Sequence, residues 1–302
     1  MIRDISLSGL CCANKRKKLI SGKCFLILDE YAFLSMWRKA SISSFVSAVL
    51  MMAPFLTARL ICRFLDGSNR SCGGRLCSEL YTLNQLTGKY WFFLNNDTLI
   101  EEDNFPNLIK RLESDPQIIG VSPLIRDCNQ HRTIQYAGYT PLSAITLRNQ
   151  AIGEGTTDAS AFPAKETPYL HGAAMLFKRE VIQQVGKMPE IFFLYYEELD
   201  WCTAMNRQGY TLWFEPSCEI LHKGSSTIGD TSPLKAFYLS RNRLLYAYRN
   251  RTGLTRILCI LYLLCIATPV QCMRAILHRQ KGICQAHLRG IHDFIKLKSK
   301  MS

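Results

Sequence analysis

Two groups of acidic side chains, about a hundred residues apart, are the part of this sequence best suited to chemistry. In the first, the apolar run Tyr90–Leu94 leads into Asn95, Asn96 and Asp97. A carboxylate after a buried strand can hold Mg²⁺ or Mn²⁺, which in turn binds a diphosphate. The two amides can hydrogen-bond sugar hydroxyls. An ordinary turn is the alternative, because Asn and Asp also hydrogen-bond their own backbone.

The second group closes an aromatic run, Phe192–Tyr196, with Glu197, Glu198 and Asp200. Apolar walls and like charges raise the pKa of a carboxyl group, which suits a general base. Helical spacing places Glu197 and Asp200 on one face and Glu198 on a neighbouring face, where it can point at a substrate. The structural alternative is a favourable interaction between these carboxylates and the start of a helix.

Three basic or imidazole side chains farther along the chain suit a phosphate group or a metal. His222 ends an apolar run, and a neutral imidazole binds divalent metals, although a lone His is more often structural. Lys223 suits a phosphate, and Arg241 on an expected helix suits a pyrophosphate. A solvent-exposed helical face is the alternative for Arg241.

The elements that must position these residues alternate between strands and helices from Tyr81 onward, which predicts an α/β layered fold. Capping residues and glycines give the helix ends, including Asp103 or Asn104 before one helix and Gly186 and Gly209 after two others. The expected strands are 90–94, 118–121, 133–137, 211–214 and 219–221, and 169–177 is expected as a strand or an extended segment. The expected helices begin near 104, at 179, at 197 and near 233.

Charge is unevenly distributed along the chain. Residues 81–240 carry 13 Lys+Arg and 18 Asp+Glu, whereas residues 241–302 carry 12 Lys+Arg and one Asp. A basic tail indicates an anionic partner, and no recognisable nucleic-acid module accompanies it, so a membrane surface is favoured over nucleic acid. The apolar segment Ile257–Val270 is shorter than the ~20 residues of a membrane crossing, which predicts a buried or interfacial helix.

The 13 cysteines lie scattered and form no recurring pair with zinc-ligand spacing, which favours free thiols in a reducing cytosol. No stretch near the start has the pattern of a signal peptide.

Taken in order, these segments resemble the family 2 glycosyltransferases, with the rhamnosyltransferase-like branch the nearest in character. The resemblance covers about residues 81–250 and rests on several ordered motifs. These are Leu94–Thr98, His171–Arg179, the stretch from Gly186 through Phe193, Tyr196–Trp201, His222 with Gly224 and Ser226, and Tyr238–Asn242.

The resemblance implies a GT-A-like fold, a mixed sheet flanked by helices, and inverting transfer of a sugar from a nucleotide-diphosphate sugar to a glycan or lipid-linked acceptor. Asp97 and His222 would hold Mg²⁺ or Mn²⁺, and Glu198 would be the catalytic base. The substrate would be bound by Asn95, Asn96, Glu197, Asp200, Trp201, Lys223 and Arg241. Such an enzyme would act in cell-envelope polysaccharide synthesis, in the cytoplasm, on the inner face of the membrane.

Residues 1–80 do not resemble the start of such an enzyme, so the fold is expected to be incomplete at its N-terminal end. The segment is a frameshift or misassigned start, a decayed half, or a divergent donor-binding half. The expected division is 1–80 unassigned, 81–250 catalytic and 251–302 a basic amphipathic tail. The alternative to an enzyme is an inactive remnant that binds a membrane or a partner.

Overall fold

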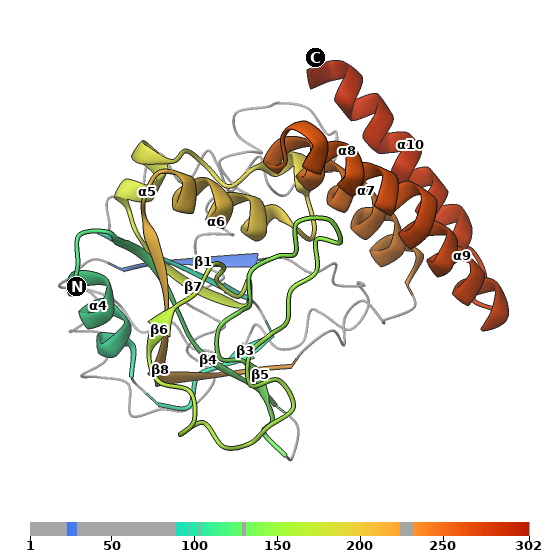
Figure 1. Cartoon of the computed structure of the whole chain (residues 1–302). Coiled ribbons are helices and arrows are strands. Elements are labelled where there is room, and N and C mark those ends of the chain that lie inside the picture. The colour runs from blue at the N-terminus through green and yellow to red at the C-terminus, as the bar shows by residue number, and fades with distance from the viewer. Residues whose placement is uncertain are drawn as a thin grey trace, which may run out of the picture.

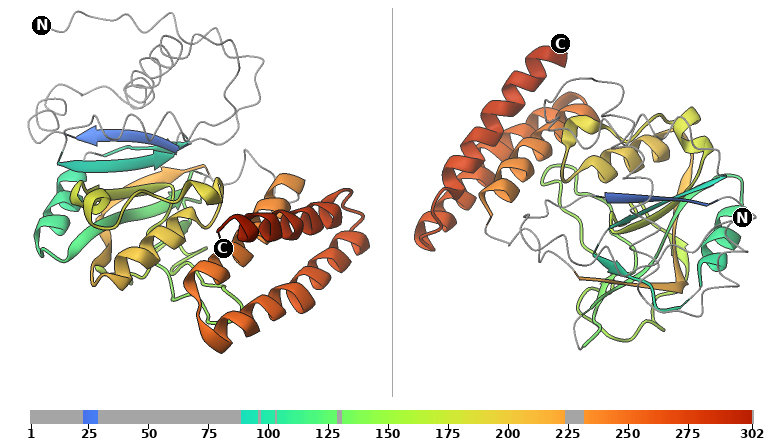
Figure 2. Two further views of the ribbon diagram at one scale, coloured as in Figure 1. Left: turned by 90° about the horizontal axis from the view of Figure 1, so that it is seen from above. Right: turned by 180° about the vertical axis from the view of Figure 1, so that it is seen from behind.

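The computed structural model describes the backbone of residues 23–28 and residues 89–95, 97–102, 104–128, 131–223 and 232–301. Within these residues a central mixed sheet lies between helices, and a group of long C-terminal helices projects to one side (Figures 1 and 2). The α/β mixed sheet flanked by helices that the sequence predicts is therefore confirmed. Nearly all of residues 1–80, and with them the three explanations for that segment, lie outside the described residues.

The sheet has the strand order β1-β2-β7-β4-β8-β3, with β5 paired to β4 and β6 paired to β8. The strands are β1 Lys23–Leu28, β2 Tyr90–Asn95, β3 Thr98–Leu99, β4 Ile118–Asp127, β5 Ile134–Tyr136, β6 Lys165–Glu166, β7 Ala174–Lys178 and β8 Thr211–His222. The helices are α4 Phe105–Glu113, α5 Glu180–Gln184, η2 Glu190–Phe192, α6 Glu197–Arg207, α7 Pro233–Asn250, α8 Gly253–Tyr262, η3 Leu263–Ala267, α9 Thr268–Leu277 and α10 Ile283–Met301.

Strand β2 shows how the sequence builds three layers. Its side chains alternate, so Tyr90, Phe92 and Leu94 join the core beneath α4, whereas Trp91 and Phe93 join the core beneath α6 and α7. This period of two is what a strand buried on both faces requires. The aromatic run before Asp97 is therefore a central element of the fold.

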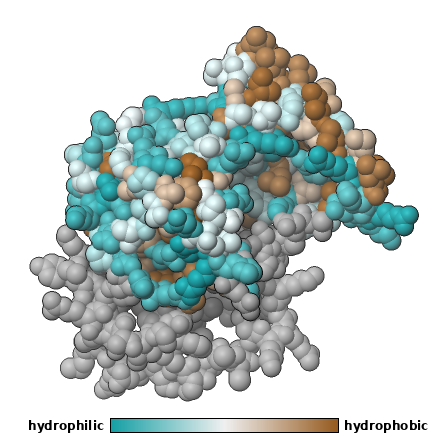
Figure 3. All heavy atoms as spheres, turned by 60° about the horizontal axis from the view of Figure 1, so that its bottom comes forward, coloured by the Kyte–Doolittle hydropathy of each residue, from teal (hydrophilic) through white to brown (hydrophobic). Residues whose placement is uncertain are grey.

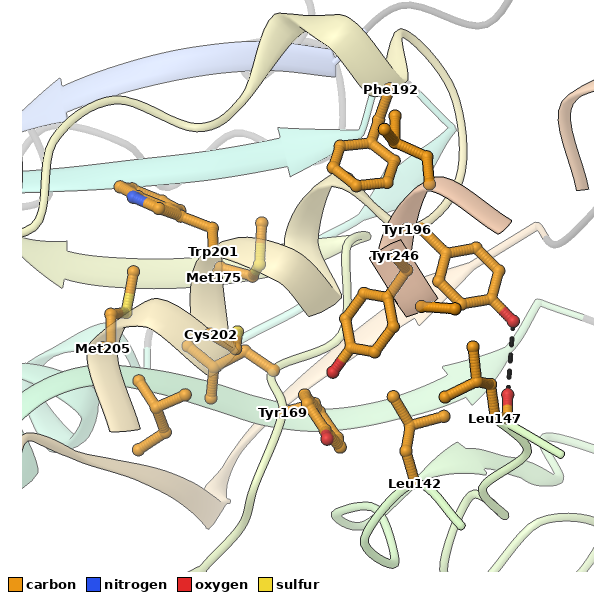
Figure 4. Packing of buried hydrophobic residues seen from close by; sticks show 14 of the residues in the cluster. Leu142, Leu147, Tyr169, Met175, Phe192, Tyr196, Trp201, Cys202, Met205 and Tyr246 are labelled. Atoms are coloured by element: carbon orange, nitrogen blue, oxygen red, sulfur yellow. Dashed lines mark hydrogen bonds between the residues drawn. The ribbon is translucent and has the colours of Figure 1, made fainter. Parts of the chain in front are cut away.

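The core between the sheet, α6 and α7 is rich in aromatic side chains (Figure 4). Trp201 lies 4.7 Å from Phe177 and 5.7 Å from Phe93, measured between ring centroids. The Tyr196 hydroxyl donates to the carbonyl of Leu147 from the other side of this core. These contacts fix the start of α6 against the sheet.

Most element boundaries agree with expectation, with three instructive differences. The segments 211–214 and 219–221 form one strand, β8, with a register shift beside Pro123 of β4. Strand β4 is longer than expected because its end also pairs with β5. Only the second half of 169–177 is a strand, β7. Asn104 precedes α4 as expected, but its side chain makes no capping hydrogen bond.

Candidate active site

Strands β2, β4 and β8 run in the same direction, because β7 lies antiparallel to both β2 and β4 and β4 pairs in parallel with β8. Their carboxyl ends, Asn95, Asp127 and His222, therefore reach the same edge of the sheet. This is the edge at which α/β sheets bind ligands. The sequence places its candidate metal ligands here.

Asp97 is held beside His222 by the backbone. Strand β3 pairs with the end of β8, with Thr98 opposite His222, and the Lys223 amide donates to the Asp97 carbonyl at 3.0 Å. The Thr98 hydroxyl closes the turn by donating to the Asn95 carbonyl at 2.7 Å. The turn expected as an alternative role for this motif therefore exists, and it presents the Asp97 carboxylate to β8.

The Asp97 carboxylate and the His222 ring approach each other closely. Oδ1 of Asp97 lies 3.3 Å from Nε2 of His222, and the Asn95 amide lies 3.5 Å from the same nitrogen. The contact between Asp97 and His222 lacks hydrogen-bond geometry, and this buried Oδ1 has no hydrogen-bond donor among the residues that the structure describes. A buried carboxylate oxygen without a donor is costly, which indicates a site for a cation.

Gln135 on β5 determines which ring nitrogen of His222 faces Asp97. Its amide nitrogen donates to the His222 carbonyl at 3.1 Å, so its amide oxygen is turned to Nδ1 of the ring, 2.8 Å away. An amide oxygen only accepts, so Nδ1 carries the proton of the neutral imidazole. Nε2 then carries the lone pair, which accepts a long hydrogen bond from the Asn95 amide at 3.5 Å and can take a second proton or bind a metal ion.

The pKa of Asp97 lies below its usual value. Burial is the largest influence and raises it, but the interaction with His222, which favours the carboxylate when the ring carries a second proton on Nε2, and the positive charge of Lys223 lower it by more. The carboxylate is therefore ionised at neutral pH, as a metal ligand must be.

The pair fits a divalent ion. Two ligands that bind one ion at right angles, each about 2.1 Å away, are about 3 Å apart, close to the observed separation. No group of three or more His, Cys, Asp or Glu side chains gathers as a metal site in the described part of the chain. Phosphate oxygens and water would supply the other ligands, as is usual for Mg²⁺ bound with a nucleotide.

The second acidic group follows a loop with an unusual backbone. Phe193, Tyr195 and Tyr196 all have positive φ, of 60°, 65° and 74°. Bulky residues rarely adopt this conformation, and each costs about 1–3 kcal/mol unless the surroundings impose it. Helix α6 begins immediately afterwards, with Glu197 and Glu198 in its first turn as expected.

Helix α7 holds this loop in place. The Asn242 amide donates to the carbonyls of Phe192, Leu194 and Tyr195 at 2.6–2.8 Å. The Arg241 guanidinium donates to the carbonyls of Ile191 and Phe192 at 2.9 and 2.6 Å. Arg241 is almost fully buried and also pairs with Asp293, so it serves the loop here and not the expected pyrophosphate.

Two further candidates are also committed to the fold. Asp200 is 4% exposed, and both its oxygens accept from Arg249, at 3.0–3.3 Å, while Asn250 donates to Oδ1. Trp201 is buried, and its indole donates to the Gly186 carbonyl at 2.9 Å. These contacts tie α6 to α7 and to the preceding loop, in place of the expected substrate contacts.

Aromatic rings lie beside the His222 ring. Tyr139 stacks on His171 with centroids 6.0 Å apart, and His171 lies 5.9 Å from the His222 ring. Burial, and next the negative charge of Glu198, raise the pKa of Tyr139. Glu197 and Glu198 are both half-buried in the first turn of α6.

The remaining candidates are Lys223, which is exposed beside Asp97, and Asn96, which lies outside the described residues. The sequence reasoning missed Gln135, Tyr139 and the role of Asn242. Gln135 gives no local signal, because only the pairing of β5 with β4 brings it to His222.

No protein-family model matches this chain. Over 156 residues it is 26% identical to the low-salt glycan biosynthesis hexosyltransferase Agl10 of Haloferax volcanii. The match covers 48% of this chain and 46% of the relative, so the chain spans about half the length of that hexosyltransferase.

Two solved structures are also similar. The mannosyltransferase PcManGT of Pyrobaculum calidifontis, in complex with GDP-Man and Mn²⁺, has a TM-score of 0.41 at 15% identity, covering 74% of this chain and 67% of that one. GalNAc-T7 with UDP, GalNAc and Mn²⁺ has a TM-score of 0.41 at 15% identity, covering 60% of this chain and 38% of that one.

Proposed function

We propose that this chain is a metal-dependent glycosyltransferase that transfers a sugar from a nucleotide-diphosphate donor to a glycan or lipid-linked acceptor, with inversion at the anomeric carbon. The observation that carries the proposal is the pair of facing acceptor atoms, Asp97 Oδ1 and His222 Nε2, at the carboxyl edge of the sheet. The sequence similarity to a hexosyltransferase supports the same class of reaction.

Asp97 and His222 would hold Mg²⁺ or Mn²⁺. A bound divalent ion neutralises the charge that develops on a departing diphosphate. Lys223 is exposed next to Asp97 and would add a positive charge for the same phosphates. Asn95, whose amide lies 3.5 Å from His222, would contact the donor beside the metal.

Glu198 would be the catalytic base. Its carboxylate would take the proton of an acceptor hydroxyl while the hydroxyl oxygen bonds to the anomeric carbon. The bond between that carbon and the diphosphate oxygen would break, and the nucleoside diphosphate would leave. The position of Glu198 in the first turn of α6, directly after the loop that Asn242 holds, supports this role.

The finer identity rests on the resemblance to the rhamnosyltransferase-like branch of family 2. That resemblance favours a GT-A fold, a hexosyl or rhamnosyl donor and a place in polysaccharide synthesis for the cell envelope. The enzyme would work in the cytoplasm on the inner face of the membrane.

Sugar transfer tests the proposal. The full chain would be incubated with UDP- and dTDP-sugars, with Mn²⁺, Mg²⁺ or a chelator, and with lipid-linked or free glycan acceptors. We expect metal-dependent release of nucleoside diphosphate and a product of inverted anomeric configuration by NMR. Asp97→Ala and Glu198→Gln should each lower turnover at least a hundredfold. Glu190→Gln, an exposed glutamate on η2, is the matched control and should retain activity.

Three outcomes would reject parts of the proposal. Turnover unaffected by both active-site changes would reject the residue assignments. Retained anomeric configuration would reject inversion. If calorimetry detects no nucleotide-sugar binding by the folded chain, the alternative holds, in which the protein is an inactive remnant that binds a membrane or a partner.

A further inference from the structure

The C-terminal helices carry an apolar surface that the catalytic proposal does not use. Helices α8, η3 and α9 form one continuous helix, Gly253–Leu277, of 25 residues, and its most apolar 18-residue window has a mean hydropathy of 1.9. The sequence reasoning expected a shorter segment ended near Val270. The helix continues because the π-helical turn η3 precedes Pro269, and such turns accommodate the missing proline N–H.

By length and composition this helix is able to cross a membrane, and only 17% of its most apolar window is buried. One face packs on the protein through Cys259, Leu263, Ala267 and Ala275. Large apolar side chains elsewhere on the helix are exposed, from Leu254 at 69% to Leu277 at 72%. Between them lie the exposed side chains of Ile257, Leu258, Leu261, Ile266, Met273 and Ile276.

These side chains form a continuous apolar ridge along the projecting helices, which Figure 3 shows as a brown band at the upper right. A soluble monomer rarely exposes a surface of this kind. A helix that is apolar on its outer face as well as its inner face needs a second apolar environment.

The charges beside the ridge indicate which environment this is. Residues 251–292 contain no Asp or Glu. Arg274, Arg279 and Lys281 are exposed around the turn between α9 and α10. Basic residues next to an apolar helix are attracted to anionic lipid headgroups.

The packing of the neighbouring helices indicates that the ridge lies along a membrane surface and does not cross it. At the start of α8, Arg251 donates to the carbonyls of Ser143 and Ala144 in the catalytic region. Helix α10 returns past α9 and packs closely on α7, where a side chain added at Gly290 would lie 2.5 Å from the Phe237 carbonyl. Asp293 of α10 also pairs with Arg241.

We propose that α8–η3–α9 is an in-plane docking helix for an anionic lipid monolayer. Its ridge inserts between headgroups and acyl chains, while Arg274, Arg279 and Lys281 bind lipid phosphates. The inference is independent of catalysis, because it concerns binding without a nucleotide sugar.

Vesicle flotation with the full chain tests this surface. We expect binding to phosphatidylcholine vesicles that contain phosphatidylglycerol, weaker binding to phosphatidylcholine alone, and release by salt. The triple variant Ile257→Asp/Leu261→Asp/Ile276→Asp should bind at least tenfold more weakly. Ile145→Asp, which changes an exposed isoleucine of the catalytic region, should bind like the unchanged protein. Arg274→Glu/Arg279→Glu should lose the preference for anionic lipid.

A depth measurement separates an in-plane helix from a spanning one. Leu258→Trp lies near one end of the helix and Ile266→Trp near its middle, and we expect both to be quenched most by lipids brominated near the headgroup, whereas in a spanning helix the middle position would lie near the bilayer centre. Different depths for the two positions would overturn the in-plane orientation. Equal vesicle binding by the unchanged protein and the triple variant would overturn the docking face. A third outcome would also overturn the docking face: the unchanged protein binds no vesicles and forms a dimer by light scattering, and the triple variant is a monomer.

Discussion

Asp97 and Asp200 are aspartates of the two acidic groups, and their surroundings differ in one respect. Asp200 accepts from Arg249 and Asn250, so its charge is neutralised within the protein. Asp97 faces His222 Nε2, an acceptor when the imidazole is neutral, and Gln135 favours that arrangement. The first is satisfied by the folded chain, whereas Oδ1 of the second has no hydrogen-bond donor among the described side chains.

This difference in hydrogen-bond partners distinguishes the two carboxylates better than burial does. Both side chains are largely enclosed, yet only Asp200 has a matching donor set. Removing a partner from a satisfied buried pair destabilises the fold, whereas changing a carboxylate that awaits a ligand chiefly affects binding.

The largest expected effect on stability follows from Asp200→Ala. This change leaves Arg249 and the buried Asn250 amide without their acceptor, and we expect a loss of about 3 kcal/mol of unfolding free energy. Urea denaturation measures it. Asp115→Ala, at an exposed turn, is the matched control and should cost less than 1 kcal/mol by the usual range for surface positions. A loss for Asp200→Ala no greater than the control's would remove its structural role.

Asn242→Ala should cost somewhat less stability, about 2 kcal/mol, and should also slow turnover. The change removes three hydrogen bonds that hold the loop containing Phe193, Tyr195 and Tyr196 at positive φ. Because this loop positions Glu198 but not Asp97, we expect kcat to fall while the Mn²⁺ affinity stays unchanged. Denaturation, turnover and calorimetric Mn²⁺ titration together test this expectation. An equal loss of Mn²⁺ affinity would show that the two acidic groups are not separate.

The sequence predicts the elements of this fold well because local patterns determine them. A continuous run of bulky apolar residues specifies β2, and Gly186 and Gly209 adopt the positive φ expected after α5 and α6. These features depend on short stretches of chain. The meeting of Asp97 with His222 does not, because it rests on the pairing of β3 with β8.

The partners of individual side chains were not predictable in the same way. Arg241 has the charge of a phosphate ligand, and only the packing of α7 on the 191–195 loop turns it to backbone carbonyls. Asp200 has the same sequence neighbourhood as Glu198, and only the packing of α7 reveals that Arg249 pairs with Asp200. Such assignments depend on contacts between elements far apart in the chain.

Gln135→Leu should leave the fold nearly unchanged and weaken the metal site. Without the amide oxygen, the Nδ1 proton of His222 loses its acceptor, and the ring is no longer held with Nε2 toward Asp97. Losing a group that orients a metal ligand typically lowers affinity about 10- to 100-fold. Titration with Mn²⁺ measures this directly, and Gln135→Glu, which keeps an acceptor, should retain more affinity. Unchanged affinity in Gln135→Leu would show that His222 is oriented by other contacts.

The smallest expected effect concerns the pH dependence of stability at Asp97. Its folded-state pKa is depressed, so the carboxylate contributes stability above its unfolded pKa of about 3.9 and loses it as the pH falls through the folded value. The metal-free protein should therefore lose slightly more stability between pH 5 and 3 than Asp97→Asn does. The difference in unfolding free energy should be less than about 1 kcal/mol, because the Asp97–His222 pair is partly exposed to solvent. Urea denaturation of both proteins across this range gives the difference. A steeper loss of stability with falling pH in Asp97→Asn would mean that His222 does not favour the ionised carboxylate. Metal titration alone would then have to support the cation expected between the two residues.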